Sequence, residues 1–352
     1  MTPYEILQTI EIELLENIAR TLAKGNIGTA EWQIKKLGDM GRLDFENQAI
    51  IKKHIKGLDA AITKDISDEL AKYSGQLDIM FQTALNSGAE LSTFLPPNAS
   101  QRIRDIISAA ERSQSSLPNL LANSMLSGAN EVYSNTINLA TTKALASIST
   151  GNQALTETLR SWAEEGLPGL VDSAGRTWQP ESYARMEMTT AKTNARTELC
   201  LERSEQYGND LIEVDSHLGA RPRCAAFQGR VYSRSGTDSD YTALADTSYG
   251  EAAGLFGVNC GHHMYPFFKG VSKQTYNQYN ETENAEAYKD RQRQRLLERK
   301  IRAAKRQVST LEAGGLDAAD AKRLVKERQS LMRDFINQTK RTRQYDREQI
   351  IS

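Results

Sequence analysis

Residues 216–233 read SHLGARPRCAAFQGRVYS, and residues 257–268 read GVNCGHHMYPFF. Three of the four histidines in the 352-residue chain and two of its three cysteines lie in these two stretches. Glycine and proline mark both as turns and loops rather than long helices. Short β-like runs beside them, at 211–214 and 230–232, indicate strands. The sequence therefore predicts a compact α+β unit whose chemistry is concentrated in its loops.

The two loops carry a ligand set for a metal ion. His217 and Cys224 lie in the first loop, and Cys260 and His262 lie in the second. Thiolate sulfur and imidazole nitrogen at four positions are the usual ligands of tetrahedral zinc. We therefore expect a structural zinc site that joins the two loops, with a binding energy that contributes to folding.

Two other interpretations of these residues stay open, because the spacing matches no standard zinc finger. The cysteines also fit small buried apolar residues, and the histidines fit hydrogen-bonded core groups. A catalytic reading would pair Cys260 with His217 as an activated thiolate, or a histidine with Asp215 for acid–base chemistry. No third orienting residue stands out in the sequence, so we expect no enzymatic activity.

Long helices are predicted on both sides of this unit. The apolar stripe from Ile6 to Leu22, with a capping box at Thr2 and Glu5, predicts an N-terminal helix. Further helices are expected over 29–37, 47–54, 60–89 and 99–146, the last broken near Pro118. Residues 97–155 are rich in Ser, Ala, Asn and Thr. Such helices either pack closely through small side chains or are completed by a partner.

The C-terminal residues predict a helical hairpin. Two apolar seams, through 297–311 and 321–335, repeat in steps of three and four residues around Gly314 and Gly315. Each seam is too short for a free coiled coil, so we expect the hairpin to dock on the rest of the chain or on another subunit.

Charge is divided unevenly along the chain. The net charge is −1, yet residues 281–352 hold 18 Lys and Arg against 12 Asp and Glu. A basic segment beside an acidic body indicates an acidic counterpart, which is nucleic acid, another protein or the body itself. A solvated helix face explains the same residues without any partner.

The chain is predicted to be mainly α with a small α+β domain, and its length suits two or three domains. We expect a helical region at 1–155, the Cys/His-containing α+β domain at 156–280 and a basic hairpin at 281–352. No apolar run approaches the roughly 18 residues that cross a bilayer, and the N-terminus lacks a secretory pattern. Nucleotide-binding, serine-hydrolase and zinc-protease motifs do not occur. A cytoplasmic site of synthesis and no membrane partner are therefore expected.

The quoted loops resemble a known signature. SHLGARPRCAAFQGRVYS, followed by SYGEAAGLFGVNCGHHMYPFFKGVSK at 248–273, is similar to the pattern of the phage minor capsid protein type 2 family. Family members often have His at position 224, and a change from His to Cys keeps a zinc ligand. The usual Arg after the family cysteine is Gly261 here. The additional His263 leaves open which of the two histidines points inward.

The resemblance implies a structural protein of a tailed bacteriophage or prophage head. Such a protein would bind the portal protein or the major capsid protein, assist head assembly, DNA packaging or ejection, and take no small-molecule substrate. It would reside in the virion after assembly in the host cytoplasm, with phage DNA as a further partner of the basic C-terminal helices. Two alternatives remain: a packaged nuclease or hydrolase-like effector that uses His217, Cys224, Cys260 and His262, and a cytosolic regulatory scaffold.

Overall fold

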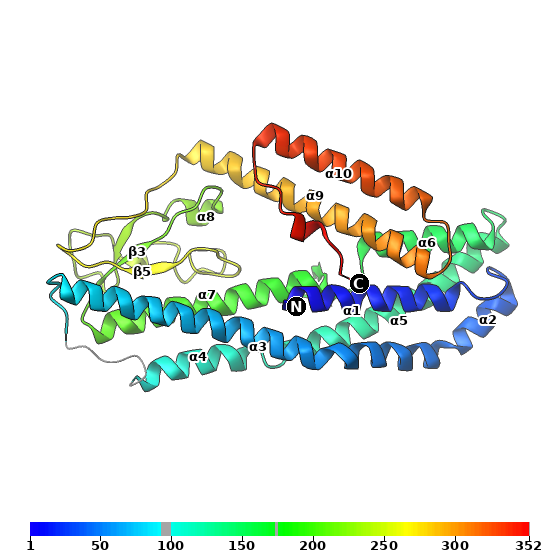
Figure 1. The fold of residues 1–352 in the computed structure, drawn as a ribbon, viewed down its shortest axis with the longest axis horizontal. Helices are drawn as coiled ribbons and strands as arrows, with labels where there is room; N and C mark the ends of the chain where they lie inside the picture. Colours follow the sequence, from blue (N-terminus) through cyan, green and yellow to red (C-terminus); the bar gives the residue numbers. More distant parts are fainter. Residues whose placement is uncertain (93–99, 173–174, 352) are drawn as a thin grey trace. The chain divides into compact units, whose positions relative to one another are not determined.

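A computed structural model describes residues 1–92, 100–172 and 175–351. The chain is mainly helical with two small antiparallel sheets, which confirms the predicted fold class (Figure 1). The helices are α1 (Pro3–Leu22), α2 (Ala30–Gly38), α3 (Met40–Asn86), α4 (Gln101–Ser113), α5 (Leu117–Leu145), α6 (Gly151–Glu165), α7 (Pro180–Gln206), α8 (Pro222–Ala225), α9 (Glu281–Ala313) and α10 (Ala319–Thr339). The strands are β1 (Leu170–Val171), β2 (Thr177–Trp178), β3 (Leu211–Val214), β4 (Val231–Ser233) and β5 (Met264–Pro266).

The chain folds into two units, each assembled from separate segments. Unit 1 comprises Met1–Ala61, Ser116–Ala184 and Gln292–Ser352, and unit 2 comprises Ile62–Ser115 and Arg185–Arg291. The predicted regions 1–155, 156–280 and 281–352 follow chain order and divide the molecule by sequence character. The boundaries of these three regions therefore stay a prediction that is based on sequence composition.

Helix α1 is the centre of unit 1. Thr2 and Glu5 form the predicted capping box, in which each side chain bonds the other residue's backbone amide. Leu14, Ile18 and Leu22 on the predicted stripe are fully buried. Helix α5 packs against α1, α2 and α6, so the N-terminal helices share one core.

Close packing through small residues explains the composition of α5. A Cβ atom at Gly128 would lie 2.4 Å from the carbonyl oxygen of Pro168, and one at Gly28 would lie 2.5 Å from the Cβ of Ala144. Neither position has room for a methyl group. Pro118 lies in the first turn of α5, after the end of α4, so the predicted break is confirmed. Residue 99, where the predicted helix starts, lies outside the described residues.

One helix is longer than the sequence predicts. The separate helices expected over 47–54 and 60–89 form a single helix of 47 residues, α3. Gly57 is exposed in its interior with open space beside it. A single exposed glycine costs a helix only about 1 kcal/mol, which is too little to end it.

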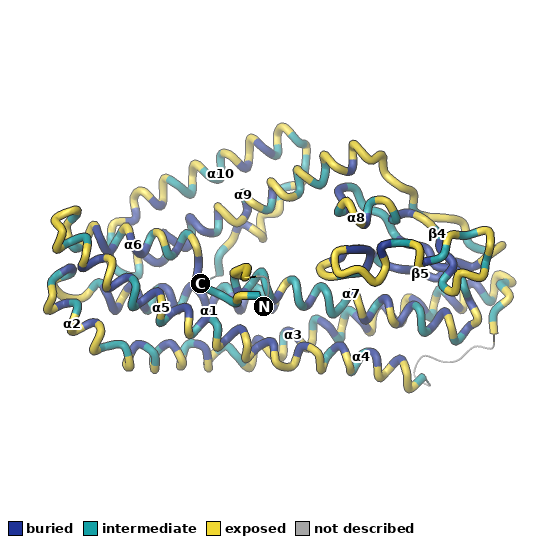
Figure 2. Tube along the Cα trace, turned by 180° about the vertical axis from the view of Figure 1, so that it is seen from behind, coloured by how far each residue is buried: buried dark blue, intermediate teal, exposed yellow. Residues whose placement is uncertain are grey.

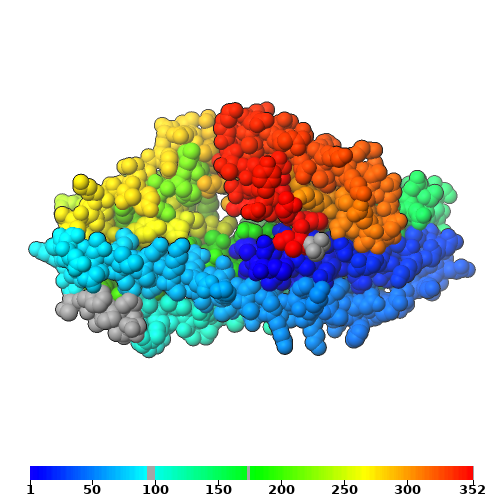
Figure 3. Space-filling model, in the orientation of Figure 1, coloured from blue at the N-terminus to red at the C-terminus, as the bar shows by residue number. Residues whose placement is uncertain are grey.

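The predicted C-terminal hairpin is present and is antiparallel. Ile301 of α9 packs against Met332 and Phe335 of α10, and the outer face of α10 is exposed (Figure 2). Within unit 1, α9 docks on other helices through ion pairs and hydrogen bonds. The chain then returns to α1, where the Thr9 hydroxyl donates a hydrogen bond to the carbonyl oxygen of Ile351 (Figure 3).

Unit 2 combines the second half of α3 with α4, α7 and a three-stranded sheet in the order β4-β3-β5. Ring contacts join Phe81, Tyr207 and Phe268 in its core. Basic side chains of α7 pair with acidic side chains of α3. These pairs are Lys192 with Asp65 and Glu69, Arg196 with Glu69, and the fully buried Arg203 with Asp78.

Among the described residues, no helix is both long and apolar enough to cross a membrane.

Candidate metal centre

The sheet of unit 2 brings the two predicted loops together. Strand β3 pairs with β5 in antiparallel register, and Val214 lies opposite Met264. The chain leaves β3 toward His217 at the same end where it enters β5 from His262. Cys224 follows on the short helix α8. Residues far apart in the sequence therefore meet at one end of one strand pair.

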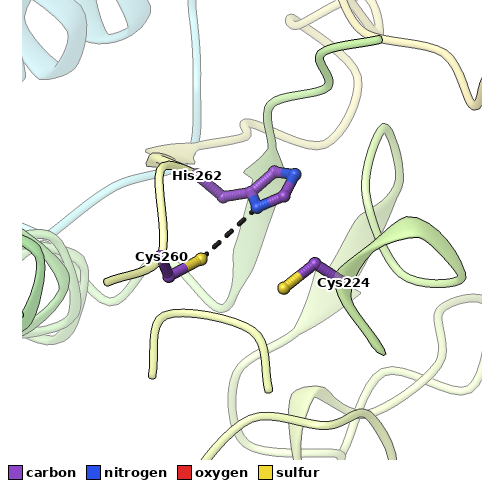
Figure 4. Close-up of side chains that lie close together, drawn as sticks. All are labelled: Cys224, Cys260 and His262. Carbon is purple, nitrogen blue, oxygen red and sulfur yellow. Dashed lines mark hydrogen bonds between the residues drawn. The ribbon is translucent and has the colours of Figure 1, made fainter. Parts of the chain in front are cut away.

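Three of the four predicted ligands form a compact cluster. The ligand atoms of Cys224, Cys260 and His262 all lie within 4.8 Å of one another. The distance from Cys260 Sγ to His262 Nδ1 is 3.4 Å. Figure 4 shows the sulfur of Cys224 directed toward this pair. The three residues are 1–2% exposed, so the cluster is closed to solvent.

The fourth predicted ligand, His217, lies beside the cluster. Its ring centroid is 4.3 Å from that of His262, in an edge-on arrangement. Its nitrogens are outside the group of atoms that lie within 4.8 Å of one another. The structure thus places His217 next to His262 rather than among the sulfur atoms.

His262, not His263, is the inward-facing histidine. His262 is buried in the cluster, whereas the imidazole of His263 is 30% exposed. His263 Nδ1 lies 3.0 Å from a carboxylate oxygen of Asp215. Consecutive side chains alternate in direction where the chain enters β5. The sequence alone does not show which of the two histidines points inward, and this alternation assigns that position to His262.

Gln228 determines the orientation of the His262 ring. Its side-chain oxygen lies 3.1 Å from His262 Nε2 and also accepts the backbone N–H of His217, at 3.0 Å. An amide oxygen is only an acceptor, so His262 Nε2 carries the hydrogen. His262 Nδ1 therefore presents its lone pair to Cys260 Sγ.

Arg221 holds the first loop against the second. Its guanidinium donates to the carbonyl oxygens of Val258, at 2.9 Å, and Gly254, at 3.3 Å. It also lies 3.8 Å from Cys224 Sγ. The backbone N–H of Phe256 donates to Cys260 Sγ at 3.2 Å. Both sulfur atoms therefore have donors that suit a thiolate.

Neighbouring helices fix the backbone of both loops. Asn284 in the first turn of α9 accepts hydrogen bonds from the N–H groups of Gly219 and Ala220, and donates to the carbonyl oxygen of Ala220. On the other side, the Thr193 hydroxyl of α7 donates to the carbonyl oxygen of Cys260. The loops are thus held by elements that the sequence pattern did not connect with them.

The electrostatics of the cluster favour a neutral imidazole and a mixed thiol–thiolate pair. Burial, followed by the nearby His262, lowers the pKa of His217 to about 4. A hydrogen bond from the thiol of Cys224 lowers the pKa of Cys260, and the same contact raises that of Cys224. These shifts favour the thiolate form at Cys260 and the uncharged form at His217.

A second titratable group lies nearby in unit 2. His263 and Tyr265 border a hollow of about 470 Å³ that Arg196 and the acidic side chains of α3 also line. The Asp215–His263 pair has the geometry of an oriented general base. The lining side chains include Lys72 and Tyr73 but no serine or cysteine.

Sequence reasoning missed Gln228 and Asn284, which are central to this arrangement. Gln228 lies 34 residues from His262, and Asn284 lies 65 residues from Gly219. Neither residue belongs to a recognisable spacing pattern. Arg221 belongs to an Arg-Pro-Arg stretch that indicates a turn. Nothing in the sequence indicates that its guanidinium bonds the carbonyl oxygens of Val258 and Gly254.

With fold and site described, the relationship to known proteins is clear. The chain belongs to the family Phage minor capsid protein 2, which it matches over residues 4–337. This match confirms the family resemblance seen in the two loops. A protein named "Structural protein" from Lactococcus phage LL-H is 29% identical over 333 residues, which cover 90% of this chain and 88% of that relative.

A shorter relative covers only part of the chain. It carries the same name in Lactococcus phage mv4 and is 34% identical over 113 residues, which are 31% of this chain and 92% of that protein. No solved structure gives a significant match.

Proposed function

We propose that this protein is a minor structural component of a phage head that binds the portal protein or the inner face of the major capsid shell. There it supports head assembly, DNA packaging or ejection. The observation that carries the proposal is the family match over residues 4–337. Since both units fall almost entirely within that range, the role belongs to the whole fold rather than to one grafted module.

Exposed apolar side chains on unit 1 support a protein partner. Ile34 of α2, Phe45 near the start of α3 and Ile148 after α5 are each more than 70% exposed. Helices α2 and α5 pack against each other. We infer that these exposed apolar side chains are the contact points for another protein.

Three arginines of the basic C-terminal segment pair with acidic residues elsewhere in unit 1. Arg302 pairs with Glu181, Arg306 with Glu11, and Arg328 with Glu164. The acidic body of the chain is therefore one counterpart of its basic segment. This use of charge supports a docked structural hairpin over a free DNA-binding arm.

Phage DNA remains a second candidate partner because of one stripe on α10. Lys326 and Arg333 form this stripe, since both are exposed and they lie seven residues apart. Seven residues are close to two helical turns, so these two side chains share a face, and the exposed Lys340 follows as the residue that ends the helix. Glu327 and Asp334 are exposed directly beside them, and they reduce the positive potential of the stripe.

Burial of the cysteines argues against the effector alternative. Cys224, Cys260 and His262 have almost no exposed surface, so a macromolecular substrate has no path to a thiolate there. The partly buried Asp215–His263 pair is another acid–base group in unit 2, and the side chains that line the adjoining hollow include no serine or cysteine nucleophile.

Quantitative mass spectrometry of purified particles tests the proposal. We expect the protein in intact heads at a small fixed ratio to the portal protein, with cross-links from unit 1 to the portal or major capsid protein. Phe45→Glu should lower incorporation, whereas Ile79→Glu, which changes a residue of similar exposure in unit 2, should not. Absence from purified particles would favour the cytosolic scaffold and refute a virion role.

A salt titration separates DNA from protein partners. If α10 binds duplex DNA, affinity falls steeply with salt, and a Lys326→Glu/Arg333→Glu variant weakens it uniformly across sequences. A matched Arg299→Glu variant changes an exposed cation on α9 instead. Equal and weak binding by all three proteins would leave the portal and shell as the partners.

A further inference from the structure

We propose that unit 2 holds one structural Zn²⁺ ion, bound by Cys224 Sγ, Cys260 Sγ and His262 Nδ1, with His217 as the fourth ligand. The ion joins α8 to the loop at 254–262. No catalytic water is needed for this role, because all four positions are filled by protein.

The spacing of the three clustered atoms suits zinc. With Zn–S near 2.3 Å and Zn–N near 2.0–2.1 Å, ligand atoms of a tetrahedral site lie about 3.6 Å apart. Cys260 Sγ and His262 Nδ1 are 3.4 Å apart, and Cys224 Sγ lies within 4.8 Å of both. Shifts of a few tenths of an ångström to about 1 Å complete the geometry, which side-chain rotation supplies.

The His262 ring is already oriented for metal binding. Its Nε2–H is directed at Gln228, which leaves Nδ1 as the available lone pair facing the sulfur atoms. A hydrogen bond from the second ring nitrogen to a fixed acceptor is the usual support of a zinc-bound histidine.

Charge balance in the buried site is compatible with an ion. Two thiolates neutralise one Zn²⁺, so the occupied site carries no net charge at 1% exposure. Arg221 and the backbone N–H of Phe256 donate to the two sulfur atoms from outside. These hydrogen bonds stabilise the negative charge of the thiolates and leave the sulfur lone pairs that face the cluster available to the metal ion.

His217 is placed to complete the shell. Its ring touches that of His262, and its Nε2 lies 4.0 Å from the position that a Cβ at residue 261 would occupy. Residue 261 is glycine, so no side chain at this position lies between the His217 ring and the second loop. A change of side-chain torsion brings His217 to the ion while Gln228 continues to hold its backbone N–H.

The ion has a mechanical purpose in this part of unit 2. Residues 234–263 contain turns, one short 3₁₀ helix and little regular structure. Such a loop gains little stability from hydrogen-bond ladders, and its apolar core is limited to side chains such as Leu244, Leu255 and Phe256. Cys224 is separated from Cys260 by 36 positions and from His262 by 38 positions. A metal ion bound by all three would supply that stability, since binding energy at a structural site counts as folding energy.

Metal analysis of the full-length protein tests the proposal. Protein purified without chelators should contain one zinc per chain. Cys224→Ser, Cys260→Ser and His262→Ala should each reduce that to below a tenth. Cys200→Ser is the matched control, because Cys200 is equally buried in unit 2 but outside the cluster, and it should keep its zinc. Intact folding with well under one zinc after refolding in excess zinc would overturn the proposal.

Cobalt replacement in the wild-type protein gives a readout that does not depend on the folding of the cysteine variants. Wild-type protein reconstituted with Co²⁺ should show thiolate-to-cobalt charge transfer together with the intense visible bands of tetrahedral cobalt. His217→Ala should shift those bands and weaken affinity at least tenfold; unchanged spectra and affinity would exclude His217 as a ligand. A Cys224–Cys260 disulfide in freshly purified protein, detected by intact mass, would refute the metal site.

Discussion

Arg306 of α9 and Glu11 of α1 form an ion pair of 3.4 Å in which both side chains are about nine-tenths buried. Arg306 also donates to the carbonyl oxygen of Ala163, and Glu11 accepts the backbone N–H of Leu167. One pair of opposite charges thus connects the hairpin, the N-terminal helix and the end of α6.

Removal of Arg306 should destabilise unit 1 strongly. Arg306→Ala leaves Glu11 buried without its cation, so we expect a loss of about 3–5 kcal/mol in the free energy of unfolding. Arg299→Ala removes an exposed charge from the same helix and should stay within about 0.5 kcal/mol. Chemical denaturation of the two full-length variants measures the difference. Equal effects would mean that the pair is no more than a surface contact.

The small residues of α5 should prove to be a packing requirement. Gly128→Ala places a methyl group 2.4 Å from the Pro168 carbonyl oxygen, and we expect destabilisation of about 1–3 kcal/mol from overpacking. Gly57→Ala makes the same change in the exposed interior of α3, where space is open. It should stabilise by about 0.5–1 kcal/mol, because alanine favours a helix. Thermal denaturation should therefore show melting temperatures that move in opposite directions.

Gly219 combines a positive φ with a close approach to α9. Gly250 has only the positive φ, so the two glycines together separate these two effects. Gly219 has φ of +80°, and a Cβ there would lie 3.1 Å from backbone atoms of Ala287 in α9. Gly250 has a similar φ of +85° with open space around it. We expect Gly250→Ala to cost about 1 kcal/mol from strain alone, and Gly219→Ala to cost more. If hydrogen exchange of the His217 loop is the same in both variants, close approach to α9 is not a constraint.

Gln228 should tune zinc affinity without touching the ion. Gln228→Leu keeps the approximate side-chain volume but removes the acceptor for His262 Nε2–H. We therefore expect zinc affinity to fall about 10- to 100-fold, which is the usual effect of removing a hydrogen-bond partner of a metal-bound histidine. Gln82→Leu, an exposed glutamine of α3, serves as the control and should leave affinity unchanged. Competition with a chromophoric chelator measures both. An unaltered affinity for Gln228→Leu would show that the His262 ring is fixed by the metal alone.

Features of the fold that depend on a few neighbouring residues were predictable from the sequence. The capping box at Thr2, the break at Pro118 and the turn at Gly314 act over a few residues, and each is present. The predicted separation of the helices at 47–54 and 60–89 is wrong, because the exposed Gly57 between them costs a helix too little to end it. The ion pairs of α7 with α3 were not predictable, since Arg196 and Glu69 are 127 residues apart and many other pairings of charge were equally open.

The candidate site was predictable as a set of residues but not as a geometry. Rare residue types concentrated in two loops indicated Cys224, Cys260 and His262, and the structure brings these three together. The choice between His262 and His263 depends on the pairing of β3 with β5, which a sequence of short strands does not reveal. The supporting roles of Gln228 and Asn284 arise from tertiary contacts alone.

The interleaved segments of the two units set the order in which the protein matures during translation. Every residue of unit 2 has been synthesised once Arg291 is added, whereas unit 1 requires residues from 292 onward. Helix α1 is thus the first element made, yet Glu11 waits for Arg306 until synthesis is nearly finished. At that stage α5 and α6 can already pack against α1, but Glu11 still lacks its cation, and a truncated product without α9 would keep this carboxylate without its ion-pair partner.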